Sequence, residues 1–96
     1  MYEDVPIYVK DFLSYMQNIK NRSKATIHEY YYDLRYALRF LKLYKLDKIK
    51  LDKINSEMLN ETDIANLDIE FIKSITLQDL YEYLNYLSNN CSDRAT

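Results

Sequence analysis

The chain has 96 residues, of which 48% are hydrophobic and 29% charged, a composition that fits one small globular domain and excludes a disordered segment. It contains no Gly and one Pro, so turns that require positive φ are scarce and we expect an all-α domain with short polar connections. A single cysteine, Cys91, excludes an internal disulfide, and no apolar run reaches the length of a membrane span, so we expect a cytoplasmic protein without membrane contact.

The net charge of −2 hides a segregation of charge along the chain. Residues 20–50 carry nine Lys or Arg against three acids, whereas residues 51–96 carry three against nine. A basic middle on an acidic body gives a directed electrostatic field, which is what orients a protein on a phosphate backbone. Chance clustering explains the same pattern, so charge alone leaves the partner open.

The first predicted helix runs to about Lys20. Asp4 is placed to cap it, and Pro6 lies in the opening turn, where the missing N–H of proline has no cost. Asn21 and Arg22 then form a short polar turn. Apolar residues at helical spacing predict the buried face of this helix, which consists of Val9, Phe12, Leu13, Met16 and Ile19.

The stretch from Ser23 to Leu41 predicts the longest helix, of about six turns. No Gly or Pro interrupts it, and Ser23 is a suitable N-cap because its hydroxyl can accept a hydrogen bond from an unpaired backbone N–H. The helix is expected to end near Tyr44 or Lys45. Spacings of three and four place one apolar stripe toward the core, made of Ile27, Tyr30, Leu34, Ala37, Leu38 and Leu41.

A second line of residues follows the same helix at spacings of four, three, four and four. It consists of Lys24, His28, Tyr31, Arg35 and Arg39. Cations at both ends, with an aromatic ring and an imidazole between them, are typical of a helix that lies along a polyanion. A solvated charged face is the alternative interpretation, and for His28 an ordinary surface histidine is the simpler one.

Residues 46–67 give the weakest pattern in the chain. They are predicted to form a polar loop with occasional apolar anchors, in which Ser56 and Thr62 could each begin a short helical turn. A connection of this length is above the usual range between helices, which favours some local structure. Asp68 is then placed to cap a further short helix that contains Phe71.

A third main helix is predicted between Thr76 and about Asn90. The Thr76 hydroxyl and the Asp79 carboxylate form an acidic version of the capping box, which satisfies backbone N–H groups at the start of a helix. Tyr81 and Tyr86 are expected to face outward or sideways. The inward stripe is predicted to consist of Leu77, Leu80, Leu84 and Leu87.

The sequence contains no motif for catalysis or for a cofactor. A chain without Gly cannot form a glycine-rich phosphate loop, and one His with one Cys cannot specify a zinc site or a Cys–His pair. The many Tyr have no neighbouring group that would activate a phenol as a nucleophile. We therefore expect no metal, no cofactor and no catalytic centre in this chain.

Four short motifs follow one another along the chain. They are Phe12-Leu-Ser-Tyr-Met16, then Ser23-x-x-Thr26-Ile27-x-x-Tyr30-x-x-Asp33-Leu34, then Phe40-Leu41, then Ile75-Thr76-x-x-Asp79-Leu80-x-x-Tyr83-Leu84. In this order and spacing they resemble the N-terminal core-binding domain of the tyrosine recombinases, the Xer-type phage integrases and related site-specific recombinases. The resemblance covers nearly the whole chain apart from about residues 46–67, which look like an insertion.

The resemblance implies a small SAM-like helical bundle over residues 1–96, with three main helices, short helical turns and the final helix of the family missing. In that family the domain forms half of a C-shaped clamp around duplex DNA, and a separate C-terminal domain cuts the DNA. It therefore implies a non-catalytic DNA-binding domain of an integrase or recombinase. Together with the polar line on the second helix, it gives as candidate DNA contacts Lys24, Thr26, His28, Tyr31, Arg35, Arg39 and Arg94.

Two further hypotheses stand beside DNA binding. The missing helix would leave an apolar groove bordered by the first and third main helices, which predicts self-association through that groove. A protein–protein interaction domain is the alternative of another class, because eleven Tyr could also serve as contacts for a partner protein. A purely structural oligomerisation domain has no signal of its own beyond the groove.

Overall fold

The structure is a computed structural model that describes residues 2–90, and within this range the regular structure is entirely helical. Two short turns add to the α-helices: a π-helical turn, Lys42–Leu46, that continues the second helix, and a 3-10 turn, Leu51–Lys53. The predicted all-α bundle of three main helices with short helical turns is confirmed. The α-helices are α1 (Ile7–Asn18), α2 (Lys24–Leu41), α3 (Ser56–Glu61), α4 (Ile69–Lys73) and α5 (Leu77–Asn90).

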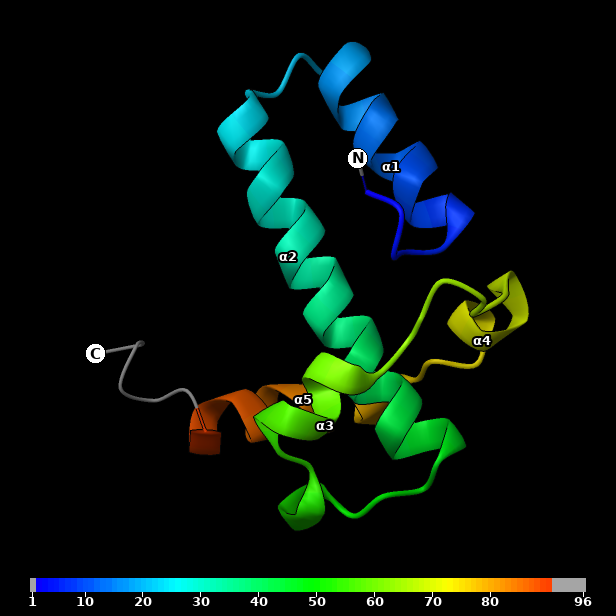
Figure 1. Ribbon diagram of the computed structural model, residues 1–96, viewed down its shortest axis with the longest axis vertical. Helices are drawn as coiled ribbons and strands as arrows, with labels where there is room; N and C mark the ends of the chain where they lie inside the picture. The colour runs from blue at the N-terminus through cyan, green and yellow to red at the C-terminus, as the bar shows by residue number, and fades with distance from the viewer. Residues whose placement is uncertain (1, 91–96) are drawn as a thin grey trace.

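Helix α2 is the central rod of the bundle (Figure 1). Helix α1 runs antiparallel beside the N-terminal part of α2, and α3 and α5 contact α2 further along the chain. Helix α5 crosses the C-terminal part of α2 rather than running beside it (Figure 1). The N-terminal part of α2 is therefore covered by α1 and by the segment that precedes α1, which positions the site described below.

Local hydrogen bonds set where α2, α4 and α5 begin, as predicted. The Ser23 hydroxyl accepts from the Thr26 N–H at 3.2 Å, and the Asp68 carboxylate accepts from the Phe71 N–H at 3.0 Å. At the start of α5 the Thr76 N–H donates to Asp79 at 2.9 Å, and the Asp79 N–H donates to the Thr76 hydroxyl at 3.1 Å. This reciprocal pair is the predicted capping box.

The prediction that Asp4 caps the first helix is wrong. Helix α1 begins after Pro6 and has no side-chain cap, because the Asp4 carboxylate is turned toward α2 instead. Val5 and Pro6 are buried directly after it, so the chain enters α1 from a fixed point. The turn between α1 and α2 is polar as predicted, and Asn21 takes a φ of 56°, which asparagine tolerates better than most residues.

One hydrophobic core joins both ends of α2. At its centre Phe40 is fully buried, and its ring lies 5.6 Å from the Tyr44 ring, 5.3 Å from Tyr83 and 5.1 Å from Tyr86. Ring pairs at these distances add favourable contacts to the burial of apolar area. Four other Tyr lie half-buried at the margin of this core, as their mixed polarity predicts: Tyr2, Tyr8, Tyr30 and Tyr36.

Helix α5 presents a different face to the core from the one predicted. Tyr86 is buried, whereas Leu77, Leu80 and Leu84 are exposed. The orientation is set by contacts distant in sequence: Asp79 forms an ion pair with Lys45 at 2.6 Å, and Tyr86 packs on Phe40. On α1, Phe12 and Ile19 are likewise exposed, while Val9 and Leu13 are buried as predicted. The leucine spacing identified the helix correctly but not its buried side.

Candidate nucleic-acid interface

The start of α2 carries a group of exposed cations. Lys24 is the first residue of the helix, and Lys20 and Arg22 lie exposed in the turn before it. The turn is fixed by a hydrogen bond from the Arg22 N–H to the Met16 carbonyl at 3.0 Å. We call Lys20, Arg22 and Lys24 the basic turn. Its three positive charges lie within five residues at the positive end of an 18-residue helix, where backbone N–H groups also favour an anion.

Thr26 and His28 continue this surface along the first turns of α2. Thr26 is half-buried, and its hydroxyl accepts a hydrogen bond from the Ser23 hydroxyl at 3.1 Å. His28 is exposed, and its Nδ1 shares a hydrogen bond of 3.4 Å with the Tyr2 hydroxyl. The His28 ring also stacks with the Tyr32 ring at 6.3 Å. These side chains are held in place by neighbours and are still reachable from solvent.

Beyond His28 the predicted line of residues is covered, so the expectation of one continuous exposed cationic face is wrong. Tyr31 is buried, and the side chains of Arg35 and Arg39 are only 26% and 15% exposed. The cover is the segment of residues 2–4, which precedes α1. We call Asp4, Tyr31, Arg35 and Arg39 the Asp4 cluster.

The contacts in the Asp4 cluster converge on the two oxygens of one carboxylate. The Tyr31 hydroxyl donates to Oδ1 of Asp4, and Arg35 Nη1 donates to Oδ2 at 2.9 Å. Arg35 Nη1 also lies 3.2 Å from the Tyr31 hydroxyl, and Arg39 Nη2 is 3.7 Å from Oδ2 of Asp4. Spacing of four residues aligns the three α2 side chains on one side of the helix, which is why a single acid can reach all of them.

The electrostatics of the Asp4 cluster favour the ionised acid. Burial alone would raise the pKa of Asp4, but hydrogen bonds from Tyr31 and Arg35 and the charge of Arg35 together hold this pKa below the ordinary 3.8. Burial raises the pKa of Tyr31, and its hydrogen bond to Asp4 raises it further. The guanidinium carbon of Arg35 lies 5.1 Å from the ring centres of both Tyr31 and Tyr32, an arrangement that adds cation–π attraction.

The remaining candidate residues differ in whether the structure places them on the surface. Lys24 and His28 are exposed as predicted, and Arg94 lies outside the described residues. Lys20 and Arg22 were not among the predicted contacts, although the excess of cations over residues 20–50 already included them. Their position beside Lys24 in the sequence was the signal that could have found them.

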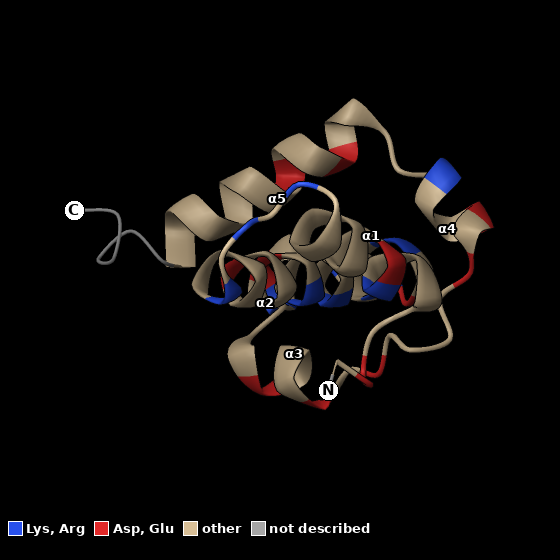
Figure 2. Ribbon diagram, turned by 90° about the horizontal axis from the view of Figure 1, so that it is seen from above, with Lys and Arg blue, Asp and Glu red and all other residues tan. Residues whose placement is uncertain are grey.

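Two other cations of the basic middle are paired within the protein, whereas Lys48 and Lys50 are exposed. Lys42 Nζ donates to the Asp63 carbonyl, and Lys45 Nζ donates to Asp79 at 2.6 Å and to the Ser74 carbonyl at 3.2 Å. Figure 2 shows Lys and Arg gathered along α2, whereas α3 and α5 carry Asp and Glu. The segregation of charge along the sequence thus persists in space, with the basic turn as an exposed part of the positive region.

Among residues 2–90, no group of His, Cys, Asp or Glu side chains is arranged to hold a metal ion. No helix within the same range is both long and apolar enough to cross a membrane. The class of protein defined by these features is a small all-α domain whose longest helix begins with a group of exposed cations and whose helices α3 and α5 carry acidic residues.

The chain belongs to the family described as phage integrase, N-terminal SAM-like domain, whose sequence profile matches residues 9–84. Over 88 residues it is 38% identical to tyrosine recombinase XerC from Caldanaerobacter subterraneus subsp. tengcongensis, an alignment that covers 92% of this chain and 24% of that relative. The chain therefore spans about a quarter of the length of this relative. No solved structure matches the chain. The resemblance stated from the sequence motifs is confirmed.

Proposed function

We propose that this chain is the DNA-binding domain of a site-specific tyrosine recombinase or integrase, and that it clamps duplex DNA at the recombination site. The observation that carries the proposal is the basic turn, which is exposed at the start of α2 in a chain of this family. Tyrosine recombinase XerC, with which it shares 38% identity, is named for recombination. DNA is therefore the partner that fits both the family and the surface.

The basic turn has the chemistry of a phosphate contact. Lys20, Arg22 and Lys24 supply charge, while Thr26 and His28 add polar groups that can approach the backbone or a base edge. Binding of this kind is dominated by release of counterions from DNA, so it weakens steeply with salt and selects sequence weakly. A single small module binds modestly, and a clamp gains strength when a second, tethered module engages the same duplex.

We do not assign DNA cleavage to these residues. The catalytic Arg, His and Tyr of the tyrosine recombinases have no matching residues here, and the matched profile is that of the N-terminal domain. The chain aligns with 24% of the XerC relative, so the strand-transfer reaction of such a protein is not attributed to this chain. Its contribution to recombination is to hold the duplex.

A titration of the ¹⁵N-labelled chain with duplex DNA tests the proposal. Amide signals of residues 20–28 should move on addition of DNA, because the basic turn and the first turns of α2 meet the phosphates. Signals of α5 should stay in place, since this helix carries no Lys or Arg that could contact phosphates. Chemical-shift changes confined to α5, or none at saturating DNA and low salt, would contradict the proposal.

A pair of matched charge removals sharpens the same test. Lys24→Ala removes an exposed cation from the basic turn, and Lys73→Ala removes an exposed cation from α4, far along the chain from the turn. Lys24→Ala should reduce the slope of log K against log salt by about one, because one phosphate contact is lost. Lys73→Ala should leave the slope unchanged, and an equal effect of both would indicate only a response to net charge.

Self-association or protein binding is the second candidate function, and the exposed face of α5 favours it. Leu77, Leu80, Tyr81 and Leu84 recur at helical spacing and are all exposed, so they form an apolar strip that nothing within residues 2–90 covers. Sedimentation equilibrium of the wild-type chain and of Leu80→Ser/Leu84→Ser distinguishes the outcomes. Association that the double substitution abolishes would support this function, whereas a monomer at every concentration would exclude self-association.

A further inference from the structure

The Asp4 cluster presents an arrangement of donors that suits a phosphodiester as well as a carboxylate. Tyr31, Arg35 and Arg39 project from three successive turns of α2 toward one point, and both oxygens at that point belong to Asp4. A phosphodiester also carries one negative charge, which is shared by its two non-bridging oxygens. Guanidinium groups and hydroxyls bind either anion through the same charge-assisted hydrogen bonds.

The Asp4 carboxylate leaves some hydrogen-bond donors of Arg39 without an acceptor. Arg39 Nη2 is 3.7 Å from Asp4 Oδ2, longer than a hydrogen bond, and Nε of Arg39 is buried without a partner among the described residues. Buried donors on an arginine are costly when left unpaired. Arg39 therefore retains hydrogen-bonding capacity that a larger anion with more oxygens could use.

The segment that carries Asp4 lies outside the helices of the bundle. Residues 2–4 belong to no helix, and the Asp4 side chain is 43% exposed. Val5 and Pro6 are buried immediately after it, so they keep α1 anchored when the segment moves. Tyr2 also helps to hold the segment, because its ring lies 4.4 Å from the Tyr31 ring and its hydroxyl shares a hydrogen bond with His28 Nδ1.

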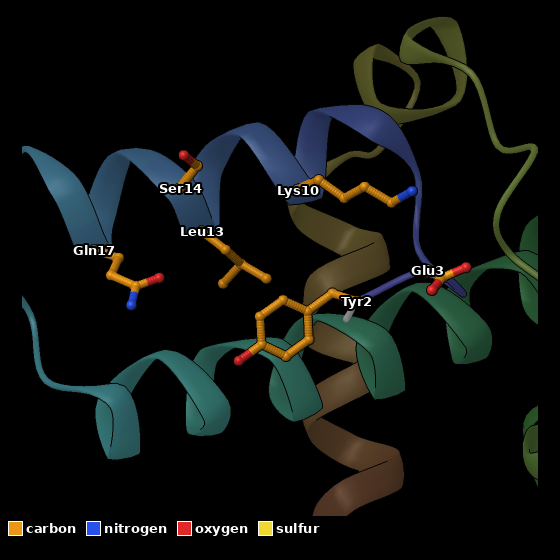
Figure 3. A pocket seen from close by; sticks show the side chains of 6 residues that line it. All are labelled: Tyr2, Glu3, Lys10, Leu13, Ser14 and Gln17. Carbon is orange, nitrogen blue, oxygen red and sulfur yellow. The ribbon is translucent and has the colours of Figure 1, made fainter.

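A pocket lies beside Tyr2. The pocket has a volume of about 230 Å³, and Figure 3 shows the Tyr2 ring between α1 and α2 with Leu13 and Gln17 projecting toward the same space. Glu3 and Lys10 lie toward one end of it (Figure 3). Tyr2 is thus packed on one side against Tyr31 and open on the other, unlike a ring fixed in a core.

We propose that Tyr31, Arg35 and Arg39 form a phosphate-binding site that Asp4 fills in the free protein and that a DNA phosphate takes over when residues 2–4 move away. The inference rests on the proposed DNA binding and extends it, because it adds a second phosphate contact beyond the basic turn. Asp4 then acts as an internal competitor, and its release is coupled to DNA binding.

The substitution Asp4→Asn tests this competition. Asn keeps the shape and an acceptor oxygen for Tyr31 but removes the charge that competes with phosphate. Asp33→Asn is the matched control, because it gives the same change in net charge. Asp33 is exposed on α2, the helix that carries Arg35, and lies outside the Asp4 cluster. Fluorescence anisotropy with a labelled duplex should show that Asp4→Asn tightens binding by roughly three-fold or more beyond Asp33→Asn and steepens its salt dependence.

A second substitution, Arg35→Ala, tests whether Asp4 competes for this arginine. Arg35→Ala should weaken DNA binding several-fold in the Asp4→Asn background and little in the wild type, where Asp4 already occupies Arg35. Thermal unfolding monitored by circular dichroism shows that each variant is folded. Tyr2→Ala, which loosens the segment and keeps the acid, should tighten binding in the same direction as Asp4→Asn.

The outcomes separate the two proposals. The competition would be overturned if the wild-type chain binds DNA, Asp4→Asn and Asp33→Asn have equal effects, and the effect of Arg35→Ala does not depend on Asp4. The DNA-binding function would then remain intact. Absence of binding by every folded variant, at low salt, would overturn both. The competition is supported if Asp4→Asn and Tyr2→Ala each bind DNA more tightly than the wild type and the Asp33→Asn control.

Discussion

Asp79→Ala should destabilise the fold far more than a surface charge removal. The Asp79 carboxylate accepts the Thr76 N–H at 2.9 Å as the cap of α5 and pairs with Lys45 at 2.6 Å. The two paired side chains are 13% and 19% exposed, so water replaces the lost partner poorly. Lys45 keeps its hydrogen bond to the Ser74 carbonyl, which limits the penalty.

The expected loss is about 2–4 kcal/mol, of which about 1 comes from the cap and the rest from a mostly buried ammonium left without its charge partner. Urea unfolding followed by far-UV circular dichroism measures it by linear extrapolation. Glu70→Ala is the control, because its ion pair with Lys73 on α4 is exposed and should contribute at most about 0.5 kcal/mol. Equal losses in both variants would refute the role given to the Lys45–Asp79 pair in orienting α5.

Three further predictions follow from the core, a cap and the paired acids. Phe40→Ala should cost about 3–5 kcal/mol in urea unfolding, because a fully buried ring among three tyrosines is removed; a loss near 1 would contradict this packing. Ser23→Ala should cost about 1 kcal/mol through loss of the α2 cap, while Ser88→Ala, exposed on α5, should not destabilise the protein. The pKa values of Asp4 and Asp79 lie below 3.8 in the folded state, so both carboxylates stabilise the protein above that pH and lose their contribution as the pH falls through the folded-state values. The melting temperature should therefore drop on acidification below about pH 4, and less steeply in Asp79→Asn.

Features that depend on neighbouring residues were predictable from the sequence. The caps at Ser23, Asp68 and Thr76 involve side chains and backbone groups three residues apart, so their hydrogen bonds follow from the local order of residue types. Of the basic turn, only Lys24 was predicted as a contact, whereas Lys20 and Arg22, which lie four and two residues before it, were not. Propensity and spacing therefore located the helices and one end of the site.

Features that depend on distant residues were not predictable. The buried face of α5 is chosen by Lys45 and Phe40, which precede the helix by more than thirty residues. Likewise, Arg35 is covered by Asp4, 31 residues away, through a contact that helical periodicity cannot reveal. The line of cations on α2 was read correctly as one side of the helix, but its exposure depended on where the N-terminal segment folds back.

The most direct test of the central claim is the salt dependence of DNA binding by the basic turn. Anisotropy titrations with a labelled duplex would compare the wild-type chain with Lys20→Ala/Arg22→Ala/Lys24→Ala, checked for folding by circular dichroism. Wild-type affinity should fall linearly on a log–log plot against salt, and the triple substitution should flatten the slope by about 2–3, close to 0.9 for each lost phosphate contact. Identical slopes for the two proteins would contradict the assignment of this surface to DNA.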